Sequence, residues 1–214
     1  MKGNCNMEAK DYLEYIVHQI HTTIVATVDE DGNPITCAID MMDCDDNNLY
    51  FLTARGKSLY SRLSSTGKIA LTAIKGKDTM HSVSVSIRGI VREIGQNKLP
   101  DLFDKNPYMN EIYPSEASRH VLTVFQIYQG NGEWFDLSKK PIERAAFSFG
   151  GAIEQKEGFF IQPELCIGCG RCIPVCPQQC IRKENGKAII QQNNCLHCGR
   201  CRDICPAGAV RQIG

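Results

Sequence analysis

Nine of the twelve cysteines in this 214-residue chain lie in two short segments close to its end, and eight of these nine share one repeated spacing. Residues 166–180 read CIGCGRCIPVCPQQC, and residues 195–209 read CLHCGRCRDICPAGA. Each segment has the spacing C-x2-C-x2-C-x3-C-P, and the second copy follows the first by 29 residues, the difference between 195 and 166. Thiolates at this spacing are typical ligands of [4Fe-4S] clusters. The pattern therefore predicts two such clusters.

The fourth cysteine of each run is expected to bind the cluster of the other run, which is the arrangement found where two such runs occur together. The predicted ligands are Cys166, Cys169, Cys172 and Cys205 for one cluster, and Cys195, Cys198, Cys201 and Cys176 for the other. Small residues between the ligands, such as Gly168 and Gly199, would let backbone amides approach the cluster sulfides. The clusters would then cross-link this part of the chain.

Zinc is the alternative metal for closely spaced cysteines. Zinc ribbons use two separated C-x2-C pairs and require neither a third cysteine three residues later nor the following proline. The spacing therefore favours iron-sulfur clusters. Cys180 aligns with Ala209, which cannot bind iron, so we expect Cys180 to fill a small apolar space beside a cluster. We expect core or surface positions for Cys5, Cys37 and Cys44, with a redox-active thiol among them as the alternative.

Residues 160–214 resemble the two-cluster bacterial ferredoxins, a resemblance that implies a small α+β domain holding both clusters. This segment has seven Lys or Arg and three Asp or Glu, a formal excess of +4. Each oxidised cluster with four thiolates contributes a charge of about −2, so the loaded module would be close to neutral. A neutral module suits a main redox partner on the same chain better than steering to varied partners.

The preceding residues predict mostly strands. An apolar stripe at Leu13, Ile16, Val17 and Ile20 indicates a first helix. Residues 21–41 predict a hairpin around an Asp-Gly-Asn-Pro turn. Further strands are expected at 48–54, 68–75 and 81–94, with a short helix at 55–65 and a helical insertion near 97–106. Residues 120–138 predict one more strand and a turn into a short last one.

Six or so antiparallel strands with small helices indicate a mostly β fold, a six-stranded antiparallel β-barrel that leaves no exposed edge. The order of elements, with YFLTARGKSLYSRL at 50–63 and GEWFDL at 132–137, resembles the pyridoxamine 5'-phosphate oxidase-like split barrels. The resemblance covers about residues 8–140 and implies an FMN-binding split barrel. The Pro, Gly-Gly and mixed charges of 139–163 are typical of a linker, so we expect domains at 1–150 and 151–214.

The same resemblance places the FMN phosphate on the segment TARGKS, and the flavin ring along the backbone of a neighbouring strand. The implied residues are Thr53, Arg55, Lys57 and Ser58 for the phosphate, and Thr36, Cys37 and Ala38 for the ring. Cations and hydroxyls on a loop that enters a helix N-terminus are suitable donors to phosphate. A solvated basic turn is the alternative. The family also implies a homodimer, because its flavin pocket is shared between subunits.

Composition limits the classes of protein that this chain can represent. The formal net charge is zero and no basic segment stands out, which argues against a nucleic-acid-binding protein. No apolar run approaches the ~20 residues needed to span a bilayer, and the first ten residues lack a secretory signal. We therefore expect a cytoplasmic protein without membrane contact, in which cysteines serve as metal ligands before disulfides.

A flavin exchanges two electrons with hydride donors and releases them one at a time, whereas each cubane carries one electron. The expected function is therefore an FMN- and iron-sulfur-dependent oxidoreductase that converts between two-electron and one-electron chemistry. Its partner would be a redox protein or a small-molecule donor or acceptor, with NAD(P)H as one candidate. The alternatives are an electron-transfer protein without its own substrate, and a haem-binding or sensing barrel. The sequence identifies neither a substrate nor a catalytic residue.

Overall fold

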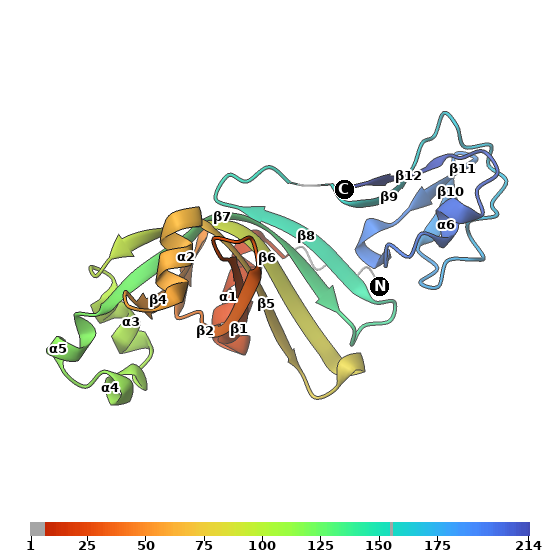
Figure 1. Ribbon diagram of the computed structural model, residues 1–214. Helices are drawn as coiled ribbons and strands as arrows, with labels where there is room; N and C mark the ends of the chain where they lie inside the picture. The colour runs from red at the N-terminus through yellow and green to blue at the C-terminus, as the bar shows by residue number, and fades with distance from the viewer. Residues whose placement is uncertain (1–6, 155) are drawn as a thin grey trace. The chain divides into compact units, whose positions relative to one another are not determined.

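The computed structural model describes residues 7–154 and 156–214, which form two compact units (Figure 1). The first unit contains the chain up to Gly76, Ser84–Trp134 and Ala146–Ile153; the second contains Lys77–Val83, Phe135–Ala145 and Glu154–Gly214. The predicted domain division near residue 150 stays a prediction, and the two units are described separately. No helix in the described parts of the chain is long and apolar enough to cross a bilayer.

An eight-stranded sheet with the order β2-β1-β5-β6-β7-β4-β3 dominates the first unit, and β8 pairs with β7. The pairs β1–β2, β1–β5, β3–β4 and β4–β7 are antiparallel. The strands are β1 (Thr22–Val28), β2 (Pro34–Asp40), β3 (Asp43–Asp45), β4 (Asn48–Ala54), β5 (Lys68–Gly76), β6 (Ser82–Gly95), β7 (Leu122–Asp136) and β8 (Glu143–Phe149). The predicted fold class, mostly β with an antiparallel sheet and small helices, is confirmed.

Short helices accompany this sheet. They are α1 (Ala9–Tyr15), a π-helical turn (Ile16–Ile20), α2 (Ser58–Thr66), a 3-10 turn (Thr79–His81), α3 (Leu99–Lys105), α4 (Met109–Ile112) and α5 (Glu116–Arg119). The apolar stripe of the first helix is buried at Leu13, Ile16 and Val17. Leu59 and Leu63 of α2 are buried as well. Packing of these apolar faces against the sheet stabilises helices that are too short to be stable alone.

One sequence prediction for this unit is wrong: residues 120–138 do not turn into a short last strand, although glycines lie at 130 and 132. Strand β7 continues through them for 15 residues. A Cβ atom on Gly132 would lie 2.2 Å from Cζ of Phe147, and one on Gly130 would lie 2.9 Å from Cζ of Phe149. The glycines therefore make room for aromatic rings of β8, a strand that we had expected to be linker.

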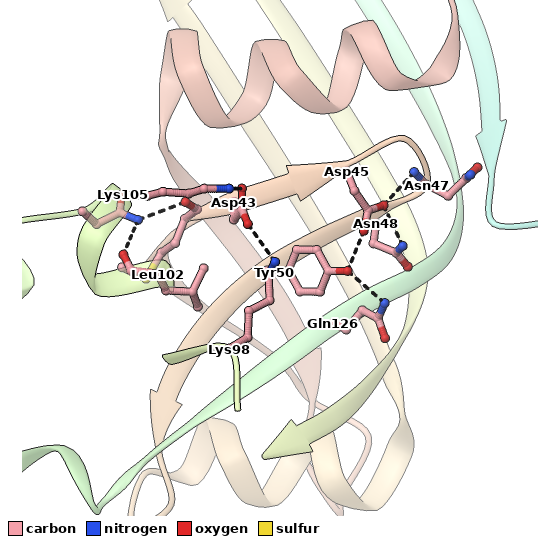
Figure 2. Close-up of polar contacts among 11 residues, drawn as sticks. Asp43, Asp45, Asn47, Asn48, Tyr50, Lys98, Leu102, Lys105 and Gln126 are labelled. Atoms are coloured by element: carbon pink, nitrogen blue, oxygen red, sulfur yellow. Dashed lines mark hydrogen bonds and ion pairs between the residues drawn. The ribbon is translucent and has the colours of Figure 1, made fainter. Parts of the chain in front are cut away.

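Polar side chains connect α3 to strands β3 and β4, as Figure 2 shows. Asp43, whose side chain is only 5% exposed, pairs with Lys105 Nζ at 2.6 Å and with Lys98 Nζ at 2.9 Å. Burial alone would raise the pKa of Asp43, but hydrogen bonds and attraction from Lys105 and Lys98 outweigh it and lower the pKa. Its contribution to stability is therefore complete above the unfolded-state pKa, about 3.9, and is lost as pH falls through the lower folded-state pKa.

We expect the double variant Lys98→Met with Lys105→Met to lower the free energy of unfolding of the first unit by about 3 kcal/mol at pH 7. The physical reason is that a buried carboxylate would keep its charge without a partner. Urea unfolding can be followed by the fluorescence of Trp134, the only tryptophan, whose ring lies 5.5 Å from that of Tyr12. The exposed control Lys75→Met should change stability by less than about 0.5 kcal/mol. Equal losses in both would contradict the role of Asp43.

The second unit is built from two two-stranded antiparallel sheets and short helical turns. Its elements are β9 (Gly158–Ile161) paired with β12 (Val210–Ile213), β10 (Ile181–Glu184) paired with β11 (Lys187–Ile190), a 3-10 turn (Gln192–Asn194) and α6 (Arg200–Asp203). Phe159, Ile181, Ile190 and Val210 form one buried core together with several cysteines. This is the small α+β domain that the cysteine runs predict.

Candidate functional site

The four predicted ligands of each cluster line one of two cavities in the second unit. The first cavity measures about 350 Å³, counting the part open to solvent, and the second about 310 Å³. Cys166, Cys169, Cys172 and Cys205 line the first, and Cys176, Cys195, Cys198 and Cys201 line the second. The fourth cysteine of each run thus lies with the first three of the other run. This is the crossed grouping that the sequence predicts, while binding of iron by these thiols stays a prediction.

The surroundings of these thiols fit a cluster of several atoms. No three His, Cys, Asp or Glu side chains in residues 7–154 and 156–214 are spaced to hold a single ion. Each set of four thiols instead lines one side of a shared hollow that is partly open to solvent. Ile161, Ala188 and Val210 give the first cavity an apolar wall. Burial raises the pKa of Cys201 to about 11, so a metal is needed there to hold a thiolate.

Backbone geometry provides the amide donors that cluster sulfurs require. Gly168 has φ of 69°, and a Cβ on it would lie 2.3 Å from the carbonyl oxygen of Gly186. Hydrogen bonds from the backbone of Ala188 and Gly168 lower the pKa of the Cys166 thiol, although its burial opposes them. Amides that stabilise the thiolate also orient it as a ligand.

Cys180 lies beside the second cavity and is 2% exposed. Its Sγ is 3.3 Å from Sγ of Cys176. The aligned Ala209 lies beside the first cavity, where its backbone N–H donates to Sγ of Cys205 at 3.3 Å. The two residues occupy corresponding places, which supports the prediction that Cys180 fills space.

Cys37 and Cys44, which lie outside the two cysteine runs, are not activated toward the reactive thiolate form. Burial raises the pKa of Cys37, and it raises the pKa of Cys44 to about 11, with the neighbouring Asp43 adding to the effect. A raised pKa disfavours the reactive thiolate, so both residues fit the packing interpretation. Cys5 lies outside the described residues.

In the first unit, the predicted phosphate-binding segment is the loop that joins β4 to α2. The backbone N–H of Lys57 donates to the carbonyl of Ala54 at 3.0 Å, and α2 begins at Ser58. Arg55, Lys57 and Ser58 are exposed at this helix N-terminus, where free amides and the helix dipole favour an anion. Arg55 and Lys57 thus lie on the loop before α2, and Ser58 is the first residue of this helix.

Thr53 differs from the other predicted donors because it is only 2% exposed. It lies in β4 opposite Thr123 of β7, and its Oγ1 has no hydrogen-bond partner among the described residues. Such an orphaned buried hydroxyl requires a partner such as water or ligand. Its role at the phosphate stays a prediction.

Glu93 of β6 holds Arg55 in place at the edge of this loop. Its carboxylate accepts hydrogen bonds from Thr123 Oγ1 at 2.6 Å, Tyr60 OH at 3.0 Å and Arg55 Nη2 at 3.5 Å. The hydrogen bond from Thr123 is the main cause that lowers the pKa of Glu93. The carboxylate therefore stays ionised at neutral pH and fixes the guanidinium. The sequence alone gave no signal for this contact across strands.

Strand β2 presents the segment predicted to line the flavin ring. Thr36 and Ala38 are exposed and Cys37 is half-buried. Burial raises the pKa of Cys37, while the charges of Arg62 and Lys57 oppose that rise. Both cations of the α2 region therefore act on β2. That these two segments hold one flavin stays a prediction.

Arg62 is a cation of this site that the sequence interpretation missed. Its Nε donates to Oγ1 of Thr27 in β1 at 2.7 Å. It follows Ser58 by four residues on α2, so the two side chains share one helix face. The spacing of four residues between Ser58 and Arg62 is the sequence signal that marks this cation.

Comparison with known families decides the assignment of the first unit. A profile described as "Pyridoxamine 5'-phosphate oxidase" matches residues 9–133, more than half of the chain. The chain belongs to the pyridoxamine 5'-phosphate oxidase family. A second profile, described as "4Fe-4S dicluster domain", matches residues 165–209. Both resemblances that the sequence motifs indicate are confirmed.

Solved structures similar to this pyridoxamine 5'-phosphate oxidase family member share its fold. One is a NimC/NimA family protein from Clostridium acetobutylicum, with a TM-score of 0.55 and 14% identity, covering 68% of this chain and 97% of that chain. Another, from the same organism, belongs to the pyridoxinephosphate oxidase family and is related to general stress protein 26 of B. subtilis. It has a TM-score of 0.51 and 17% identity, covering 64% of this chain and 94% of that chain.

One curated relative of this family member matches at the sequence level over a short segment. The benzylsuccinate synthase activating enzyme of Thauera aromatica is 37% identical over 41 residues. These residues are 18% of this chain and 12% of that enzyme. The match therefore spans about an eighth of the relative's length.

Proposed function

We propose that this pyridoxamine 5'-phosphate oxidase family member binds FMN and two [4Fe-4S] clusters and acts as an oxidoreductase that passes electrons between them. A redox or electron-transfer role follows from the two families that the chain joins. The observation that carries the finer proposal is the combination, on one chain, of an exposed cationic loop at the α2 N-terminus with two cavities, each lined by the four predicted ligands of one cluster.

The residues assigned to FMN in this proposal act as binding and orienting groups. Arg55, Lys57, Ser58 and the first amides of α2 would hold the phosphate, and the exposed segment 36–38 of β2 would lie along the ring. Arg62 would add a third cation, on the same helix face as Ser58. When bound, FMN would exchange electron pairs with a donor and single electrons with the clusters.

The proposed partner is either a redox protein or a small-molecule electron donor or acceptor, with NAD(P)H as the first candidate. The proposed compartment is the cytoplasm, where reducing conditions keep cysteines available as ligands. Steady-state assays with NAD(P)H and small acceptors separate an enzyme from a protein that only relays electrons. Turnover at a protein partner alone would favour the electron-transfer alternative.

Cofactor analysis of anaerobically purified protein tests the proposal directly. We expect about eight iron and eight acid-labile sulfide per chain, because two four-iron cubanes are implied, together with one FMN. The visible spectrum should contain flavin bands over the broad iron-sulfur absorption. Iron near four per chain, or stoichiometric zinc, would contradict the two-cluster part. A haem spectrum without flavin would replace the FMN part with the haem-binding alternative.

We further propose a homodimer, because large apolar side chains remain exposed across neighbouring strands of the first unit. Ile24 of β1 is 51% exposed, Ile74 of β5 is 64% exposed and Ile90 of β6 is 41% exposed. These strands are adjacent in the sheet order β1-β5-β6. Large exposed apolar side chains on adjacent strands are typical of protein interfaces.

Light scattering on the loaded protein should therefore give twice the chain mass of 23.9 kDa. The double variant Ile24→Glu with Ile74→Glu should shift the protein toward the monomer, because charges would be buried without partners. Lys68→Glu, an exposed change on β5, serves as the control and should leave the mass unchanged. A flavin-loaded monomer of the parent protein would contradict the dimer.

A further inference from the structure

His197, in the second cysteine run, has a left-handed backbone conformation that is unusual for a residue with a side chain. Its φ is 53°, and the aligned residue of the first run, Gly168, has φ of 69°. Glycine adopts this left-handed region freely, whereas residues with a Cβ adopt it uncommonly. An outlier of this kind points to a task for the side chain.

The ring of His197 packs against Gly158 and Phe159. A Cβ atom on Gly158 would lie 2.5 Å from Nε2 of His197, so only glycine fits there. The ring of Phe159 meets the imidazole edge-on at 6.4 Å between centroids. Nη1 of Arg144 lies 2.9 Å from Nδ1 of His197 and also contacts Nε2. The imidazole thus supports a guanidinium that comes from another segment of the second unit.

That segment, residues 142–144, is fixed by two further contacts. Nδ2 of Asn194 donates to the carbonyl of Ile142 at 2.9 Å, and the backbone N–H of Ile142 donates to Oε1 of Gln178 at 3.2 Å. Asn194 directly precedes Cys195, and Gln178 follows Cys176 by two residues. All three contacts therefore involve loops that carry ligands predicted for the second cluster.

The first cysteine run has different residues at the corresponding positions. With the offset of 29 residues, Gln178 aligns with Ala207, Asn194 with Leu165 and His197 with Gly168. None of these three has a side chain that could hold a polar segment in this way. The first run has a cation of another kind, because Nζ of Lys187 donates to the carbonyl of Cys166. The two cysteine runs therefore differ in the cation that contacts them: Arg144 contacts a side chain of the second run, and Lys187 contacts the backbone of the first.

Arg144 is half-buried and interacts electrostatically with Cys195 and with Glu157. Reduction adds one negative charge to a cluster, so a fixed cation nearby stabilises the reduced state and raises the potential. Partial burial weakens the screening of such a charge by solvent. The negative charge of Glu157 would lower the reduction potential, so its removal provides a test of opposite sign.

We propose that Arg144 is a positioning residue for the second cluster: its guanidinium is held on the loop of His197, its segment is anchored at Ile142 by Gln178 and Asn194, and its charge raises the reduction potential of that cluster selectively. The inference rests on the proposed binding of two clusters. An electron delivered to the second unit would then favour the cluster held by Cys176, Cys195, Cys198 and Cys201. The charge of Arg144 would thus favour electron transfer from the first cluster to the second.

Redox titration of the anaerobic full-length protein, followed by electron paramagnetic resonance, tests this inference. Arg144→Met keeps the aliphatic stem and removes the charge, and we expect the reduction equilibrium of the second cluster to shift about tenfold toward oxidation. For a one-electron couple this shift is about 59 mV. Arg144→Lys should recover most of the shift. Glu157→Gln should move the same cluster in the opposite direction.

Lys187→Met is the matched control, because it removes a cation that contacts the backbone of Cys166, a predicted ligand of the first cluster, and should move the first cluster instead. Equal potentials in Arg144→Met and the parent, with full iron content, would overturn the inference, as would an equal shift of both clusters. If Arg144→Met loses iron, Glu157→Gln decides, and an unmoved second potential in that variant would overturn the inference. Iron near four in the parent would instead overturn the two-cluster proposal, and this inference with it.

Discussion

Cys205→Ser is expected to abolish the first cluster and leave the second one in place. Cys205 is a neighbour of the second run in sequence, yet it lines the cavity of Cys166, Cys169 and Cys172. A serine hydroxyl is a poor replacement because the thiolate is the ligand. Iron and sulfide should fall from about eight to about four per chain. Electron paramagnetic resonance should identify the lost signal as that of the first cluster.

Two matched variants make this result decisive. Cys176→Ser should remove the second cluster, whose cavity it lines. Cys180→Ala should keep all iron, because Ala209 already fills the corresponding place beside the first cavity. If Cys205→Ser instead removed the cluster of Cys195, Cys198 and Cys201, the crossed grouping would be wrong. Loss of iron in Cys180→Ala would show that it is more than a filler.

The cysteine grouping could be predicted from the sequence because the chemistry of the ligands is local and strict. Three thiolates at C-x2-C-x2-C spacing must converge within one loop, and the missing fourth ligand must come from elsewhere. The repeat leaves only the other run as its source. The strands β1, β2, β4, β5 and β6 were predictable for a similar reason, since alternation and turn residues lie next to one another in sequence.

The features that sequence analysis missed depend on contacts between distant residues. Gly130 and Gly132 look like turn residues until the rings of Phe147 and Phe149 are placed against them. The carboxylate of Glu93 gathers donors from three elements, and no local pattern marks such a residue. The segment around Arg144 looked like linker because its composition is that of a linker, although its contacts belong to a packed unit.

The variant Lys57→Ala with Ser58→Ala should release FMN without changing the iron content. Both residues are exposed where α2 begins. A charge-assisted hydrogen bond to phosphate contributes about 1.5 to 3 kcal/mol, so each loss should weaken FMN binding roughly ten- to hundredfold. Titration of flavin-free protein with FMN, followed by flavin fluorescence, measures the affinity. Iron analysis of the same samples should stay at the parent value.

A control of the same chemical type is available at the other end of α2. Ser65→Ala with Lys68→Ala removes one hydroxyl and one lysine from exposed positions near the helix C-terminus. There the helix presents carbonyl groups and the negative end of its dipole, so no phosphate is expected. This control should bind FMN as tightly as the parent.

The comparison of these two variants separates a binding site from a charged surface. If both variants weakened FMN equally, the effect would come from overall charge, and TARGKS would be a basic turn. If only the variant of Lys57 and Ser58 loses flavin, the anion is held at the helix N-terminus. Thr53 then provides the finer distinction, because its buried hydroxyl has no partner among the described residues. Thr53→Val keeps the shape of the side chain, and weaker FMN binding by this variant would assign that hydroxyl to the flavin site.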